Sequence, residues 1–175
     1  MAEPAALTLR LLTGQPAEVA ALQCVLEAAP DYFLRVTGTL PGEAEARSTF
    51  TALPRDKGYE DKFVWGLYEG EAMIGCADVI RGYPVREKAV IGLLLLAQPW
   101  QRRGLGRAFS GLVEHAIADW PEILRLRIGV VASNEGALAF WRKLGYRETG
   151  EIKAGEQEFV GQVVVLEKPV APRSA

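Results

Sequence analysis

The sequence predicts an α/β (α+β) fold in which a single mixed, mostly antiparallel central sheet is flanked by helices. Strand-like and helix-like patterns follow one another in the order β-α-α-β-β-β-α-β-α-β-β, with no repeat or linker between them. With 175 residues, 49% of them hydrophobic, the chain is long enough to bury one sizeable core. We therefore expect one domain over residues 1–168 and a C-terminal tail over residues 169–175.

The N-terminal part begins with a strand and continues into helices. Residues 7–12, "LTLRLL", alternate apolar and polar positions, and Pro16 stands where a helix can begin. That helix is expected to continue to Pro30. The stretch "PDYFLRVTGTLPG" mixes proline, glycine, threonine and aromatic residues, which is typical of a loop with a short irregular turn. A second helix is expected from residue 43 to about residue 52, before Pro54.

Three strands are predicted in the middle of the chain. Residues 62–82 read as two strands joined by a hairpin at Glu69-Gly70, and a third strand follows the turn at Gly82-Tyr83-Pro84. Residues 89–97 are apolar on both faces, so this third strand should lie in the centre of the sheet. Gly92 inside it is compatible with a bulge, and equally with simple packing relief.

The C-terminal half begins with the best-defined helix. Its apolar positions recur every three or four residues and are Leu105, Ala108, Phe109, Leu112, Val113, Ala116, Ile117 and Trp120. A strand follows at residues 123–131. A short helix then begins near Asn134 and ends before Gly145, and two closing strands complete the sheet.

The overall composition excludes several classes of protein. A net charge of -2 with mixed signs gives no positive field for nucleic acid, and the longest apolar run is too short to span a membrane. Without a recognisable signal peptide, we expect a cytoplasmic protein. Cys24 and Cys76 match no metal-binding spacing, and His115 is the single histidine, so no metal site is expected. Both cysteines are predicted to be buried.

The junction "QPWQRRGLGRAF" suggests an anion site at a helix start. The first amides of a helix have no intrahelical partner, and Gly104 and Gly106 have no Cβ to hold an anion away from them. Arg102, Arg103 and Arg107 add positive charge.

Other interpretations of this junction are weaker or undecided. A dinucleotide fingerprint would need glycine where Phe109 stands, and no P-loop string is present. A glycine-rich turn that merely begins a helix remains an alternative.

Two strings together carry a resemblance to a known family. Gln101, Gly104 and Gly106 fit Q/R-x-x-G-x-G/A, and "NEGALAFWRKLGY" is similar to N-x-x-A-x-x-Φ-Y-x-x-x-G-F. The second string matches at Asn134, Ala137, Phe140, Gly145 and, conservatively, Tyr146. Residues 5–168 thus resemble the GNAT superfamily of acyl-CoA-dependent N-acetyltransferases, which implies a GNAT-like sheet whose central strands splay apart.

The resemblance implies acetyl-CoA as a cosubstrate, bound between the strands at residues 89–97 and 124–131. Main-chain groups of the first strand would pair with the pantetheine arm, and amides of the junction would hold the pyrophosphate. The expected cofactor-binding residues are Leu94, Leu95, Leu96, Gln101, Arg102, Arg103, Gly104, Leu105, Gly106, Arg107, Asn134 and Trp141.

The implied reaction needs a base, because an amine of pKa near 10 is mostly protonated at neutral pH. Asp78 is the best candidate, since alternation places it on one face with Ile74, Cys76 and Ile80, where desolvation should raise its pKa. A structural carboxylate satisfied by backbone donors is the alternative.

The family's tyrosine, thought to protonate the departing thiolate, is Trp141 here. Indole cannot release a proton, so another hydroxyl acts or the thiolate leaves with hydrogen-bond and solvent help. Tyr83 is our candidate, with Tyr68 and Tyr32 as alternatives. Trp141 itself is interpreted mainly as packing surface beside the cofactor.

Acceptor recognition is expected in the irregular segment before residue 43. Asp31, Tyr32 and Phe33 offer a cation partner and an aromatic wall for an amine, although a plain structural turn is an equal alternative. The leading hypothesis is an acetyl-CoA-dependent N-acetyltransferase that acts on a small-molecule or peptide amine by direct attack in a ternary complex. A non-catalytic acyl-CoA sensor and a nucleotide-binding protein of another class are the alternatives, and a homodimer is left open.

Overall fold

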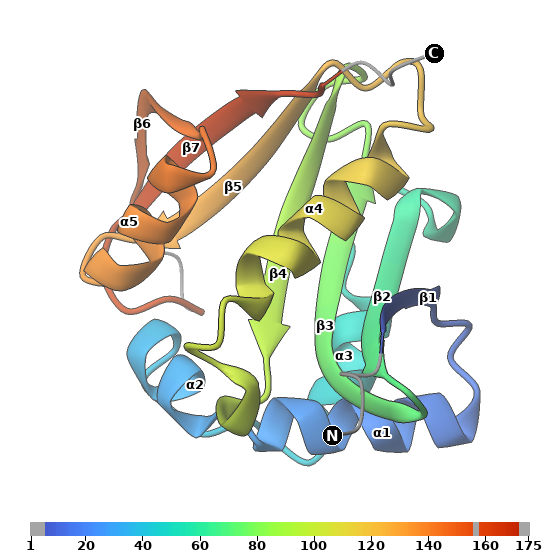
Figure 1. The fold of residues 1–175 in the computed structure, drawn as a ribbon. Coiled ribbons are helices and arrows are strands. Elements are labelled where there is room, and N and C mark those ends of the chain that lie inside the picture. The colour runs from blue at the N-terminus through green and yellow to red at the C-terminus, as the bar shows by residue number, and fades with distance from the viewer. Residues whose placement is uncertain (1–5, 156–157, 172–175) are drawn as a thin grey trace.

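The computed structural model describes residues 6–155 and 158–171, and its centre is a seven-stranded sheet (Figure 1). The strand order is β1-β2-β3-β4-β5-β7-β6, and every neighbouring pair is antiparallel except the parallel pair β4–β5. This confirms the predicted mixed, mostly antiparallel sheet, with β4 at its centre. The strands are β1 Leu7–Leu11, β2 Lys62–Glu69, β3 Ala72–Arg81, β4 Lys88–Leu96, β5 Arg125–Val131, β6 Arg147–Lys153 and β7 Val163–Pro169.

Helices cover both faces of the sheet. They are α1 Pro16–Glu27, α2 Pro30–Val36, α3 Glu45–Thr51, α4 Leu105–Ile117 and α5 Glu135–Lys143, with short 3-10 turns η1 Tyr59–Asp61 and η2 Gln98–Trp100. Helices α4 and α5 pack on one face, and α1, α2 and α3 pack on the other (Figure 1). The apolar stripe of α4 is buried as expected, with Phe109, Val113 and Ile117 fully inaccessible to solvent.

The segment after α1 is a helix, so the prediction of a loop at "PDYFLRV" was wrong. Helix α1 ends at Glu27, and Pro30 occupies the first turn of α2, where its missing N–H has no intrahelical acceptor to lose. Phe33 and Val36, three residues apart, are both buried. Their packing stabilises a helix that local propensity does not favour.

A bulge in β3 corrects the predicted face of Ile74. Leu67 pairs with Gly75 and Tyr68 pairs with Met73, so Ile74 is an extra residue in the ladder. Ile74 consequently packs in the core under α4, whereas Cys76 packs under α1. After this bulge the side chains alternate between the two faces of the sheet as predicted, so Asp78 lies on the same face as Cys76.

Two smaller expectations also differ from the structure. Cys76 is buried as predicted, but Cys24 is exposed on α1. The last strand includes Pro169, and the amide of Val170 donates to the carbonyl of Leu124, so the packed sheet extends past the predicted boundary at residue 168. Residues 172–175 of the predicted tail lie outside the described residues. No helix in the described part of the chain is long and apolar enough to cross a membrane.

Candidate active site

The site lies where the two central strands separate. Strands β4 and β5 pair only from Lys88–Arg125 to Ile91–Ile128. Immediately beyond, Asp78 pairs with Leu93 while Val79 pairs with Ile91, which leaves Gly92 as an extra residue of β4. This register shift is a bulge, the first of the two interpretations that the sequence left open for Gly92, and it turns β4 away from its parallel neighbour.

The end of β4 presents unpaired main-chain groups to the gap. The amide of Ala97 donates to the carbonyl of Ile74 at 2.9 Å, so the alternating antiparallel ladder directs the main chain of Leu95 toward β3. The main-chain groups of Leu94 and Leu96 therefore point toward β5, with which they form no ladder. Of the three leucines predicted to bind the pantetheine arm, Leu94 and Leu96 are the two whose main chain faces the gap.

Gln101 fixes the chain at the exit of β4. Its Nε2 donates to the carbonyl oxygen of Leu96 at 2.8 Å. This bond ties the loop before α4 to the last residue of the strand. Gln101 therefore holds the loop in place, in addition to any contact with a ligand.

The loop that follows leaves a row of amides without acceptors. In the described part of the chain, no main-chain amide from Arg102 to Arg107 donates to another protein group, and α4 has no side-chain N-cap. Gly104 adopts a left-handed φ of 77° at the N-cap position, which glycine adopts without strain. Free amides at a helix N-terminus stabilise an anion, so the loop has the geometry that an anion site needs.

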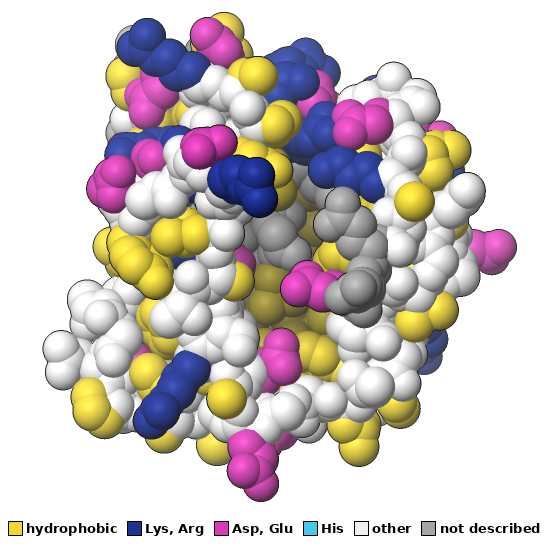
Figure 2. All heavy atoms as spheres, turned by 180° about the vertical axis from the view of Figure 1, so that it is seen from behind, with side chains coloured by type: hydrophobic (Ala, Val, Ile, Leu, Met, Phe, Trp, Pro, Cys, Tyr) yellow, Lys and Arg dark blue, Asp and Glu magenta, His cyan; other side chains and the backbone are white. Residues whose placement is uncertain are grey.

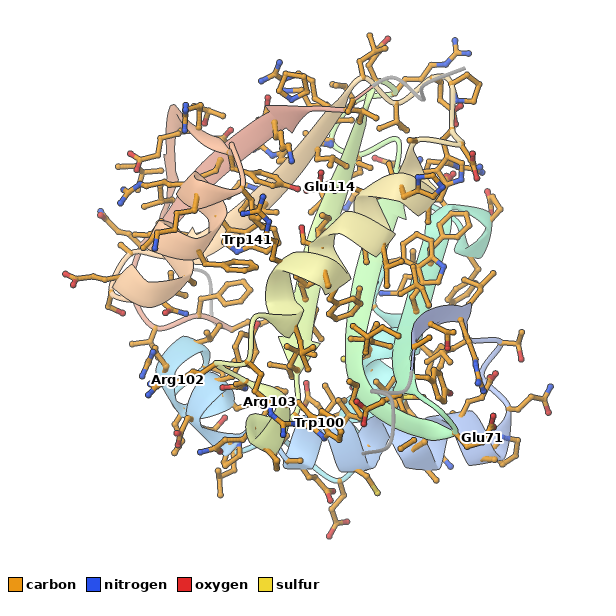
Figure 3. The ribbon with its side chains drawn as sticks, in the orientation of Figure 1. Glu71, Trp100, Arg102, Arg103, Glu114 and Trp141 are labelled. Carbon is orange, nitrogen blue, oxygen red and sulfur yellow. The ribbon has the colours of Figure 1, made fainter. Side chains whose placement is uncertain are left out.

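The arginines of the loop are close to these amides and have no acidic partner within the described residues. Trp100, Arg102 and Arg103 gather near the start of α4 (Figure 3). The Arg103 guanidinium carbon lies 5.0 Å from the centre of the Trp100 ring, and no ion pair involves Arg102, Arg103 or Arg107. Their positive charge is therefore not neutralised within this part of the chain.

The residues of the second motif, "NEGALAFWRKLGY", contribute mainly by packing α5 against α4. A Cβ at Gly106 would come within 3.2 Å of the Phe140 ring, so this glycine lets α5 approach the first turn of α4. The Asn134 side chain accepts a hydrogen bond from the Ala137 amide and caps α5. Asn134 is thus explained by capping, which positions α5 beside the loop.

Trp141 is a buried core residue. It is 8% exposed, and its ring makes edge contacts with Tyr146 and Phe140, at centroid distances of 4.9 and 5.1 Å. It lies on α5, on the side facing α4 (Figure 3). This placement agrees with the interpretation of Trp141 as packing surface.

Asp78 lies opposite the bulge and pairs with a buried lysine. Its Oδ2 accepts a hydrogen bond from Lys62 Nζ at 2.8 Å, and a Cβ built on Gly92 would be 3.7 Å from that oxygen. Nζ is also 2.8 Å from the buried Oδ1, so the ammonium forms an ion pair with both carboxylate oxygens, although only Oδ2 accepts a well-directed hydrogen bond. Burial raises the pKa of Asp78, and the Lys62 ammonium opposes that rise.

The three candidate hydroxyls lie at different places. Tyr83 is in the turn after β3, five residues beyond Asp78 and about 16 Å along the strand direction, where its amide donates to the Lys88 carbonyl. Tyr68 stacks under Arg10 at the other end of β2. The structure does not bring Tyr83, our sequence-based candidate, to the bulge.

Of the three candidate tyrosines, Tyr32 is the one that packs beside both β4 and β5. Its ring packs against two buried clusters, one that contains Leu95 of β4 and one that contains Val131 of β5. Burial, followed by the nearby Cys76 and Glu45, raises the pKa of Tyr32 to about 12, so its hydroxyl stays protonated.

The neighbours of Tyr32 on α2 differ in exposure. Phe33 is 6% exposed and belongs to the core, so it is not an open aromatic wall. Asp31 is exposed, and its Oδ2 accepts a hydrogen bond from Gln98 Nε2 at 3.2 Å. Viewed from the side of α1, α2 and α3, the molecule is hollowed near its centre, and hydrophobic side chains form the floor (Figure 2).

A cluster of charges at the paired end of β4 and β5 was missed by the sequence analysis. Glu167 of β7, 7% exposed at its side chain, accepts hydrogen bonds from Lys88, Arg125 and Arg127 at 2.6, 2.9 and 3.0 Å. Burial raises the pKa of Glu167, but these three cations outweigh it and lower the pKa to about 2. The available signal was the presence of charged residues inside otherwise apolar strands.

This architecture defines the class of protein. A sheet that opens at its one parallel pair, beside a helix start with free amides, is suited to an extended ligand that carries a phosphate group. The chain belongs to the acetyltransferase (GNAT) family, whose family profile matches residues 26–146. No curated protein sequence is similar enough to the chain to match it.

Solved structures share the fold over nearly their whole length. An acetyltransferase from Thermus thermophilus is 27% identical with a TM-score of 0.74, covering 95% of this chain and 99% of its own. The ribosomal-protein-S18-alanine N-acetyltransferase from Escherichia coli is 19% identical with a TM-score of 0.67, covering 97% of each chain. An aminoglycoside acetyltransferase in complex with coenzyme A is 19% identical with a TM-score of 0.72, covering 94% of this chain and 95% of its own.

Proposed function

We propose that this protein is an acetyl-CoA-dependent N-acetyltransferase that transfers an acetyl group to a primary amine of a small molecule or peptide, by direct attack in a ternary complex. One observation carries the proposal. The free main-chain groups of Leu94, the free amide of Leu96 and the free amides of residues 102–107 flank the same opening between β4 and β5. This arrangement fits an arm that forms amide hydrogen bonds and ends in a pyrophosphate.

The chain's own residues account for binding of the cosubstrate. The amides from Arg102 to Arg107 would hold the pyrophosphate, with charge from the unpaired arginines. Leu94 and Leu96 would pair with the pantetheine amides as an added strand does. Acetyl-CoA supplies an activated acyl group as a thioester.

Asp78 is proposed as the group that takes a proton from the acceptor amine. Its carboxylate lies beside the bulge at Gly92, with Oδ2 nearest, where β4 stops pairing with β5. A raised pKa makes this carboxylate a better base than an exposed aspartate.

Tyr32 is proposed to stabilise the departing sulfur, in place of the family tyrosine that is Trp141 here. A phenol with a pKa of about 12 is a poor donor of a whole proton to a thiolate, whose pKa is near 8.5. Tyr32 therefore acts by a hydrogen bond, and the proton reaches sulfur from solvent. Asp31, exposed next to it on α2, remains our candidate contact for the acceptor.

Calorimetry and turnover test this function together. The expected result is binding of acetyl-CoA at micromolar concentration, with NAD and ATP as matched competitors that bind far more weakly. Coenzyme A release should then depend on an added amine, supplied as a peptide with a free N-terminal alanine or as an N-blocked peptide with one lysine. Failure to bind acetyl-CoA at high micromolar concentration would exclude the proposal.

A non-catalytic acyl-CoA sensor is the second candidate. Trp141 at the family's tyrosine position and the ion pair that already engages Asp78 favour it. Under this alternative, acetyl-CoA binds but no amine accelerates coenzyme A release. Release that depends on amine and is lost in Asp78→Ala would reject the sensor.

A further inference from the structure

Lys62 is a buried lysine, and burying a charged ammonium group costs free energy because the group loses its hydration. It is the first residue of β2, and its side chain is only 4% exposed. Its Nζ donates to Asp78 Oδ2 at 2.8 Å and to the carbonyl oxygen of Ala52, just after α3, at 2.9 Å. A buried ammonium is retained only when it is well paired, and here two acceptors on different elements pair it.

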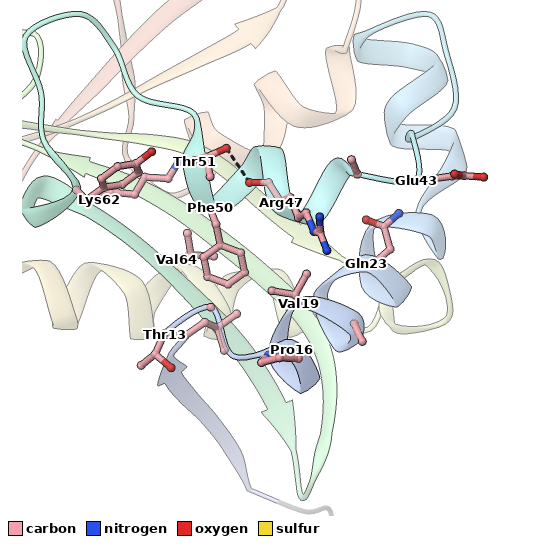
Figure 4. A pocket seen from close by; sticks show the side chains of 15 residues that line it. Thr13, Pro16, Val19, Gln23, Glu43, Arg47, Phe50, Thr51, Lys62 and Val64 are labelled. Atoms are coloured by element: carbon pink, nitrogen blue, oxygen red, sulfur yellow. Dashed lines mark hydrogen bonds between the residues drawn. The ribbon is translucent and has the colours of Figure 1, made fainter.

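Lys62 also lines a groove that does not include Asp78. A groove of about 970 Å³ lies between α1, α3 and the start of β2, with Val19, Phe50 and Val64 among its apolar lining residues (Figure 4). Lys62 lines this groove, whereas Asp78 does not. The lysine therefore lies between the groove and the carboxylate, and Asp78 borders the bulge of β4 on its other side.

Lys62 is also the main charge near Asp78. On β4, the residues facing Asp78 are Gly92 and Leu93, which carry no charge. The nearest titratable groups on other elements are the Cys76 thiol on β3 and, next to that thiol, the Tyr32 phenol on α2. The end of α3 contributes the Ala52 carbonyl, through Lys62. Within the described residues, Lys62 is the one cation that pairs with Asp78.

We propose that Lys62 is a positioning residue for Asp78: its ammonium, 2.8 Å from both carboxylate oxygens, holds the carboxylate in place beside the bulge of β4, where it receives a proton from the acceptor amine. This inference rests on the proposed function, in which Asp78 is that acceptor. In the transfer step the amine proton moves to the Asp78 carboxylate, the nitrogen forms the new C–N bond and the C–S bond breaks with its electron pair on sulfur. Lys62 keeps its own proton throughout.

The charge of Lys62 also favours the ionised form of Asp78. Burial alone raises the pKa of Asp78, and the ammonium at 2.8 Å opposes that effect. Without it, the carboxyl would stay protonated at higher pH and could not accept a proton. An opposite charge at this distance lowers a carboxyl pKa by about one to three units.

A titration without any ligand tests the pairing directly. The Asp78 carboxyl carbon is followed by ¹³C NMR in aspartate-labelled protein free of acetyl-CoA, and Asp78→Asn identifies its signal. Lys62→Met should raise the pKa of Asp78 by about one to three units, and Lys62→Arg, which keeps the charge, should leave it near the wild-type value. An unchanged pKa in Lys62→Met would overturn the inference.

The pH profile of turnover separates positioning from general damage. With either peptide acceptor, Lys62→Met should move the acid limb of kcat/KM upward and recover much of the rate at high pH, while acetyl-CoA affinity is unchanged. Equal loss at every pH would mean that Lys62 is merely structural. If Asp78→Asn keeps full turnover, the assignment of Asp78 as base fails instead, and the NMR result still reports on the ion pair.

Discussion

The two ends of the β4–β5 pair are built in opposite ways. At the paired end, Lys88 to Ile91 form a parallel ladder with Arg125 to Ile128, and Glu167 of β7 binds cations from both strands. At the open end, residues 92–96 form no ladder with β5, and the main-chain groups of Leu94 and Leu96 face the gap. The same two strands thus change from a reinforced junction to an opening within a few residues.

The paired end of β4 and β5 stabilises the sheet, whereas the open end leaves main-chain groups available to a ligand. Unpaired strand edges weaken a sheet and invite other chains to pair with them. Here the open edge lies inside the molecule, where an extended ligand can add hydrogen bonds. The ion pairs of Glu167 stabilise the opposite end of the two strands, so the strands can separate at the open end while the sheet stays folded.

Breaking the paired end should have the largest effect. Glu167→Gln removes the charge that three buried or half-buried cations share, which should lower the free energy of unfolding by about 3 kcal/mol. Chemical denaturation measures it. Glu151→Gln, on the exposed partner of Arg127, is the control and should cost far less, because solvent screens an exposed ion pair. Equal effects of the two variants would contradict the assigned role.

The same cluster predicts an acid dependence of stability. The pKa of Glu167 falls from about 4.3 in the unfolded chain to about 2 in the folded protein, so its contribution is fully present above the unfolded value. It should be lost as the pH decreases toward 2. Denaturation at a series of pH values should show this loss in the wild type and a flatter profile in Glu167→Gln.

Blocking the open end should abolish ligand binding while the fold remains. Gly106→Glu places a negative charge at the first turn of α4 and a Cβ 3.2 Å from Phe140, and acetyl-CoA affinity should decrease at least about 100-fold. Gly111→Glu makes the same change on the same helix, at a site with open space around its Cβ. Calorimetry should find nearly wild-type affinity for Gly111→Glu, and a comparable loss there would argue against a site at the helix start.

Removing one hydroxyl sharpens the chemistry at the open end. Tyr32→Phe keeps the ring that packs beside β4 and β5 but removes its hydrogen bond, so kcat should fall about tenfold with acetyl-CoA affinity unchanged. Tyr83→Phe, in the turn beyond β3, is the matched control and should keep the wild-type kcat. If instead kcat fell in Tyr83→Phe and not in Tyr32→Phe, Tyr83 would be the residue that stabilises the departing sulfur.

A change on α5 should have the smallest effect. Trp141→Phe shortens a buried ring that contacts Tyr146 and Phe140, and should cost about 1 kcal/mol of stability. Thermal melting should register a decrease of about 2–4 °C. The kcat should stay within about twofold of wild type, and a larger loss would give Trp141 a chemical role.

Local patterns predicted the elements better than their edges and faces. The period of α4 and the apolar run of β4 are strong signals, because burial on one or both faces constrains every position. Helix α2 was missed because its stability comes from Phe33 and Val36 packing on other elements. The face of Ile74 was missed because a bulge changes the alternation that the prediction assumed.

By itself, the sequence determined the fold class, the central strand, the glycine-rich helix start and Asp78 as the candidate base. These depend on residues close together in the chain, whose spacing fixes a period or a row of amides. Only the tertiary structure decided that Lys62 pairs with Asp78, that Glu167 joins β4 to β5, and that Tyr32 and not Tyr83 lies by the opening. Each of these contacts joins distant parts of the chain, and strand register together with packing determines which side chains meet.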